Sequence, residues 1–73
     1  MIQQQTLPPE PASASAARRF AQSVLDQWHE TDLADVVALL VSELVTNAVL
    51  HAGSPVQIAV RRRGATVRIE VAD

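Results

Sequence analysis

The sequence contains no cysteine, no lysine and no tyrosine, and Phe20 and Trp28 are its two aromatic residues. Without cysteine the chain has neither disulfides nor thiolate metal sites. With so few aromatic side chains, a core must be built mainly from Ala, Val, Leu and Ile. At 73 residues the chain forms at most one small domain, whose core contributes roughly 3–5 kcal/mol of stability.

Strong charge and targeting signals are also missing. A net charge of −2 provides no general attraction to nucleic acid or to an anionic membrane. The N-terminal MIQQQTLPPEP has neither the basic region nor the apolar run of a signal peptide, and no apolar stretch reaches membrane-spanning length. We therefore expect a cytoplasmic protein with no nucleic-acid partner and no membrane partner.

The first half of the chain predicts a polar lead and one helix. Residues 1–12 contain three prolines, which forbid a regular helix, and form either a flexible lead or a short edge strand over Ile2–Leu7. Residues 13–30 form the helix, with Ser13 or Ser15 as its cap. Its apolar face has helical spacing and comprises Ala17, Phe20, Ala21, Val24, Leu25 and Trp28.

A second helix is predicted over residues 32–52. Thr31 or Asp32 can cap its start, and Gly53 followed by Pro55 ends it. Its predicted core stripe is wide and consists of Leu33, Val36, Val37, Leu40, Val41, Leu44, Val45 and Ala48.

The apolar period then changes from helical to two, which predicts two half-buried strands over residues 56–61 and 66–71. Residues 62–65, with Gly64, form the turn of this hairpin, and Arg and Glu side chains pair across its wet face. The predicted fold class is α+β: a two-layer α/β sandwich of two helices on an antiparallel hairpin. The hairpin would leave two unpaired sheet edges.

Glu43, Asn47 and His51 recur every four residues and therefore share one side of the second helix. On a helical wheel they fall within or at the rim of the apolar stripe, so we expect them on the core side. One interpretation is that Asn47 and His51 bond to loop backbone while Glu43 is exposed. The other is that the three line a cavity for water, an ion or a ligand, and carboxylate and amide oxygens suit Mg²⁺.

The stretch LLVSELVTNAVLHAGSPVQIAVRRRGATVRIEVAD, residues 39–73, resembles the N-box helix and hairpin of the GHKL (Bergerat-fold) ATPases. The preceding helix, with Ala17-Arg18-Arg19-Phe20 and Trp28, resembles the opening of the anti-sigma-factor serine kinases in that superfamily. The resemblance covers residues 8–73. It implies that residues 13–73 are the N-terminal part of a histidine-kinase-like ATPase domain, a partial Bergerat fold.

The resemblance also implies roles for individual residues. Asn47 would bind the Mg²⁺ that holds the ATP phosphates, and Glu43 would activate the acceptor hydroxyl. Ala48 would let the nucleotide lie against the helix, and Asp73 would accept a hydrogen bond from adenine. His51 would order the helix end. The lid and Gly-rich boxes that follow in the family are not among the 73 residues, so we expect a truncated domain.

Two classes of function follow. The first is an ATP-dependent regulator that phosphorylates a serine of an anti-sigma-factor antagonist and can bind a sigma factor. The second is a non-catalytic interaction module that forms a homodimer or adds a strand to a partner, or a remnant that binds no ATP alone. The sequence leaves open whether the protein is an enzyme.

Overall fold

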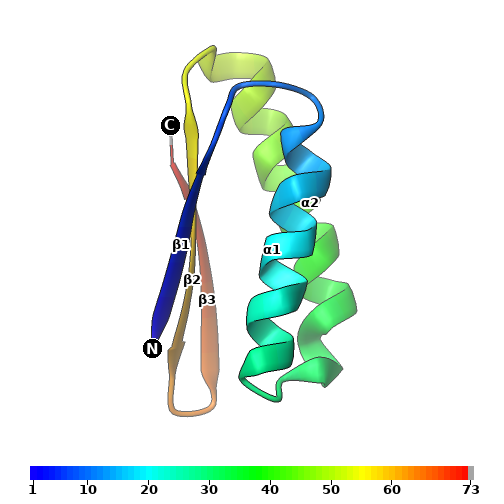
Figure 1. The fold of residues 1–73 in the computed structure, drawn as a ribbon, viewed down its shortest axis with the longest axis vertical. Helices are drawn as coiled ribbons and strands as arrows, with labels where there is room; N and C mark the ends of the chain where they lie inside the picture. The colour runs from blue at the N-terminus through cyan, green and yellow to red at the C-terminus, as the bar shows by residue number, and fades with distance from the viewer. Residues whose placement is uncertain (73) are drawn as a thin grey trace.

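The computed structural model describes residues 1–72, with the side chain of Ala52 outside the description. Three strands form one antiparallel sheet in the order β1-β2-β3, and two helices lie against one of its faces (Figure 1). This is the predicted α+β two-layer sandwich. The elements are β1 (Ile2–Leu7), α1 (Ser13–Gln27), the 3-10 helix η1 (Thr31–Leu33), α2 (Ala34–Ala52), β2 (Val56–Arg63) and β3 (Thr66–Ala72).

The N-terminal lead is a strand, which settles the alternative left open by the sequence. β1 pairs with β2 along its whole length, from Ile2 opposite Arg61 to Leu7 opposite Val56. The Met1 ammonium donates to the carbonyl of Arg62 at 3.0 Å, and the Arg62 N–H donates back to the Met1 carbonyl at 2.9 Å. The sheet therefore has β2 at its centre, with β1 and β3 as its edges.

The helix starts differ from the predicted caps. Ala12 is the N-cap of α1, and the Ser13 hydroxyl instead donates to the Pro8 carbonyl at 2.6 Å. Thr31 and Asp32 lie in η1, and α2 begins after Leu33 without a side-chain cap. The turn η1 thus takes up Thr31 and Asp32 before α2, whereas Ser13 and Ser15 lie within α1 itself.

The helix ends follow backbone geometry. Gly53 ends α2 in the left-handed conformation, with φ 64°, as its position predicted. α1 ends at Gln27 rather than at residue 30, because His29 also adopts a left-handed φ of 59°. The backbone turns back at this point, and the N–H of Glu30 donates a hydrogen bond to the Leu25 carbonyl at 2.8 Å, which ends the helix.

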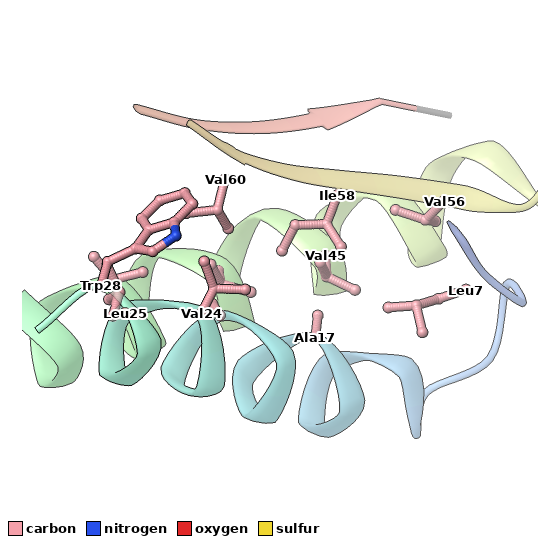
Figure 2. Packing of buried hydrophobic residues seen from close by; sticks show 12 residues of the cluster. Leu7, Ala17, Val24, Leu25, Trp28, Val45, Val56, Ile58 and Val60 are labelled. Atoms are coloured by element: carbon pink, nitrogen blue, oxygen red, sulfur yellow. The ribbon is translucent and has the colours of Figure 1, made fainter. Parts of the chain in front are cut away.

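The core lies between the helices and the inner face of β2 (Figure 2). Val56, Ile58 and Val60 have no exposed surface, and Trp28, 8% exposed, covers the end of the core beside Val60. The helices contribute Ala17, Ala21, Val24, Leu25, Val37, Val41 and Val45.

Half of the predicted core stripe of α2 is not buried. Leu33, Val36, Leu40 and Leu44 are 37–59% exposed, so their assignment to the core was wrong. One side of α2 packs on α1, and another side packs on the sheet. Together these contacts bury Val37, Val41 and Val45. Since β3 is the last strand among the described residues, nothing in this part of the chain covers the remaining apolar side.

The hairpin loop is shorter than predicted. β2 continues to Arg63 and β3 starts at Thr66, so Gly64 (φ 61°) and Ala65 form the loop. Arg61 and Glu70 form the expected ion pair on the wet face. Arg62 instead turns to the helical layer.

Arg62 ties the hairpin to the end of α1. Its Nη1 donates to the Trp28 carbonyl at 2.9 Å, and its Nη2 lies 3.0 Å from Oε1 of Glu30. Both side chains of this ion pair are less than a third exposed, so water screens it only in part. Arg62 therefore joins the two layers at the end of the molecule where the hairpin loop lies.

The sequence expectation that no stretch could span a membrane needs one correction. Thr31–His51 has 21 residues and a mean hydropathy of 1.9, enough to cross a bilayer by length and composition alone. In the fold, however, Val37, Val41 and Val45 of this segment pack into the core. Only 22% of this apolar stretch is buried in the structure, so packing into the core accounts for part of its apolar character.

Replacing His29 by glycine should stabilise the protein, because a side chain in the left-handed region costs about 1 kcal/mol that glycine does not. Thermal melts should show a midpoint about 4 °C or more above wild type. His29→Ala, which keeps a Cβ, is the control and should show no gain. A His29→Gly midpoint at or below wild type would contradict this account of the helix end.

Removing the charged end of Arg62 should destabilise the protein. Arg62→Met keeps the apolar stem but loses both contacts, at a cost of about 1–2 kcal/mol in the free energy of unfolding. Urea titration measures the loss, and Arg63→Met, at an exposed neighbour, should change it by less than about 0.5 kcal/mol. Equal effects of the two substitutions would show that Arg62 does not join the layers.

Candidate functional site

Glu43, Asn47 and His51 lie on one side of the unbroken helix α2, as their spacing predicted. All three are exposed, so the prediction that they face the core was wrong. The wheel identified the correct apolar neighbours, Val36, Leu40 and Leu44, but these residues are exposed as well. The polar and apolar residues together form what we call the open face of α2, comprising Val36, Leu40, Glu43, Leu44, Asn47 and His51.

The polar side chains of the open face have free hydrogen-bonding groups. Within residues 1–72, no side-chain hydrogen bond or ion pair involves Glu43, Asn47 or His51. The interpretation that Asn47 and His51 are held by loop backbone is therefore not supported. Their acceptors and donors point to solvent and are accessible to a ligand.

The open face lies beside β3, whose inward residues Val67, Ile69 and Val71 are only half-buried. α2 contacts both β2 and β3. The acid and the amide therefore stand at the margin of an apolar surface that is continuous with the free edge of the sheet. This combination would give a ligand one polar anchor and one apolar wall.

The other predicted site residues have different positions. Ala48 is half-buried and packs against the core, so a larger side chain there would press on the sheet. Asp73 lies outside the described residues. The structure thus places Glu43, Asn47 and Ala48 on adjacent turns of one helix.

The Asn47 amide suits Mg²⁺ held jointly with a phosphate ligand. Its oxygen is a hard donor, the Glu43 carboxylate lies one helical turn away, and Mg²⁺ usually keeps waters and takes few protein ligands. Among residues 1–72, no three His, Asp or Glu side chains gather into a possible metal cage. The remaining ligands would therefore come from water and from phosphate oxygens, for which the exposure of this face leaves room.

Two hollows in the described surface are lined by other residues. One is lined by Pro11, Thr46, Val49 and Leu50, and the other by Arg61, Arg63, Thr66 and Arg68 on the outer face of the hairpin. The sequence analysis placed Arg62 and Arg63 in the hairpin turn and did not group Arg61 and Arg63 with Arg68. The two-residue period of the strands was the signal that could have grouped Arg61, Arg63 and Arg68 on one face.

An acid and an amide one turn apart on a helix, followed by an antiparallel hairpin, are the features in which the chain resembles the GHKL-type nucleotide-binding domains. The family model described as the histidine kinase-like ATPase domain matches residues 7–73. The chain therefore belongs to the histidine kinase-like ATPase family, whose domains in general bind ATP with Mg²⁺. Searches of curated proteins and of solved structures each found no match.

Because the Asn47 side chain forms no hydrogen bond within residues 1–72, replacing it should not weaken the fold. Asn47→Ala should leave the free energy of unfolding unchanged or raise it by about 0.5 kcal/mol, since alanine favours a helix more than asparagine does. Val45→Ala, at a side chain with no exposed surface, should cost roughly 2 kcal/mol in the same urea titration. A loss above about 1 kcal/mol in Asn47→Ala would show that Asn47 has a structural partner.

Proposed function

We propose that the chain is an ATP-binding regulatory module that binds Mg-ATP on the open face of α2. The observation that supports this most directly is the solvent-facing pair Glu43 and Asn47, in a chain whose residues 7–73 match the family model. In this proposal the amide oxygen of Asn47 binds Mg²⁺. The small side chain of Ala48 lets the nucleotide lie close against the helix. Asp73 accepts a hydrogen bond from the adenine amino group.

We further propose that the module acts as a protein serine kinase of the anti-sigma-factor type. Bound Mg-ATP supplies the γ-phosphoryl group. Glu43 accepts the proton of a serine hydroxyl on the partner, while the serine oxygen bonds to Pγ and the bridging bond to the β-phosphate breaks, releasing ADP. An exposed carboxylate fits this role because the serine arrives on a separate protein. The partner would be the antagonist of an anti-sigma factor, and the module could also bind a sigma factor.

A second candidate function is supported by a different observation. Leu40 and Leu44 are 50% and 42% exposed beside an edge strand, and apolar surface of this kind is typical of protein interaction sites. In a non-catalytic interaction module, Asn47→Ala would leave partner binding intact. In the ATP-binding module, the same substitution removes nucleotide affinity.

The ATP-binding proposal is tested by thermal melts of the 73-residue chain with and without millimolar Mg-ATP. A ligand that binds only the folded state raises stability by RT ln(1 + [L]/Kd), about 2.7 kcal/mol at a hundredfold excess over Kd. We expect a clear rise for wild type and none for Asn47→Ala. Thr46→Ala, at an exposed neighbour outside the open face, is the matched control and should keep the rise.

Further variants separate binding from transfer. Glu43→Gln should keep the Mg-ATP shift, because Glu43 acts on the acceptor hydroxyl, and should lose phosphoryl transfer to a serine substrate. A cooperative melt of wild type that Mg-ATP does not change would overturn independent nucleotide binding and favour the interaction module. If the chain shows no cooperative melt at all, the result would favour the interpretation that the chain is a remnant that binds no ATP alone.

A further inference from the structure

Four side chains on the outer face of the hairpin enclose a hollow of about 260 Å³. They are Arg61, Arg63, Thr66 and Arg68, and none of them takes part in the proposed nucleotide site on α2. We propose that this hollow, which we call the arginine hollow, binds a phosphate monoester. The inference does not depend on ATP binding, because α2 lies against the other face of the sheet (Figure 1).

The register of the hairpin explains the outline of the arginine hollow. Arg61 stands opposite Arg68, and Arg63 stands opposite Thr66. Cross-strand neighbours have their Cβ atoms about 5 Å apart, and residues two positions apart on one strand are separated by about 7 Å. The four side chains therefore stand at the corners of a small rectangle on one face of the sheet.

The floor of the arginine hollow is backbone. Arg62 and Val67 lie between the corners, opposite each other in the hairpin. Arg62 donates to the Trp28 carbonyl in the helical layer, and Val67 packs against the core. Neither side chain therefore fills the centre of the rectangle, and a small group can approach between the arginines.

The described residues neutralise the positive charge of the arginine hollow only in part. Glu70 pairs with Nε of Arg61, which leaves the Nη donors of Arg61 for a ligand. Within residues 1–72, no ion pair involves Arg63 or Arg68. Two positive charges thus remain, and a phosphate monoester carries about −1.5 to −2 at pH 7. A carboxylate, with a single charge, would neutralise only half of them.

The donors of the arginine hollow suit a phosphate group. Arg61 and Arg68 are a like-charged cross-strand pair, which is unfavourable until an anion lies between them. Guanidinium groups donate paired hydrogen bonds to phosphate oxygens, and the Thr66 hydroxyl provides a further donor at the fourth corner. All four side chains of the rim can therefore donate to one group.

The extent of the charge favours a single phosphate group over an extended polyanion. Beyond Glu70, the outer face of the described sheet has uncharged side chains, among them Gln4, Thr6, Gln57 and Ala59. A net charge of −2 gives the chain no long-range attraction to nucleic acid or to an anionic membrane. The positive charge is therefore confined to the end of the sheet at the hairpin loop.

The outer face is accessible whatever lies beside the sheet. In a two-layer α/β sandwich the helices cover one face of the sheet, and the other face is solvated. Strands that extend the sheet past β3 would lie beside Thr66 and Arg68 rather than above them, because neighbouring strands share the plane of the sheet. The arginine hollow therefore does not require the sheet to end at β3.

Titrations of the full chain, followed by the NMR signals of the arginine side-chain N–H groups, test the proposal. The probes are a short glycine peptide with a central phosphoserine and the same peptide with serine or glutamate at that position. We expect saturable binding of the phosphoserine peptide, about tenfold weaker binding of the glutamate peptide and no binding of the serine peptide. Equal binding of the phosphoserine and glutamate peptides would overturn the assignment to phosphate.

Substitutions locate the binding site. Arg63→Gln and Arg68→Gln should each weaken phosphoserine binding about tenfold, and Arg68→Lys, which keeps the charge but not the planar fork, by a few-fold. Arg19→Gln, the same change at an exposed arginine of α1, is the matched control and should leave the affinity unchanged. Asn47→Ala should also leave it unchanged, which separates this site from the proposed nucleotide site.

Glycerol phosphate carries the same monoester on a small molecule and distinguishes the source of the ligand. Tighter binding of the peptide supports a phosphorylated partner protein, and tighter binding of glycerol phosphate supports a small-molecule ligand. A wild-type chain that binds neither at millimolar concentration would overturn the proposal. So would equal losses in Arg68→Gln and Arg19→Gln, which would indicate a general attraction between charges rather than a site.

Discussion

The structure depends on the burial of β2, the only described strand with a neighbour on each side. Val56, Ile58 and Val60 fill its inner face and have no exposed surface, and both helices pack against that face (Figure 2). Because a three-stranded sheet is only about two helices wide, α1 and α2 cover most of its inner face and leave Val67, Ile69 and Val71 of β3 half-buried. No described element remains to cover the far side of α2, which is why that side is open.

The sequence predicted those elements whose stability is local. Helical spacing, Gly53 and the change to a two-residue period each reflect backbone and side-chain chemistry within a few residues, and the structure has the helices and the hairpin. The sequence did not decide between a strand and a flexible lead for Ile2–Leu7, because this segment is mostly polar. In the structure only Leu7 of β1 is buried. The strand conformation of β1 comes from backbone pairing with β2, 49–59 residues away, which no local pattern encodes.

The sequence predicted which residues make up the candidate site, but it did not predict that they face solvent rather than the core. The spacing of Glu43, Asn47 and His51 placed them correctly on one side of α2, and the wheel placed them correctly among Val36, Leu40 and Leu44. A wheel measures how wide an apolar stripe is, but it does not show which part of the stripe the rest of the fold covers. The stripe of α2 spans about 180° of the wheel, and α1 and the sheet cover only the part around Val37, Val41 and Val45.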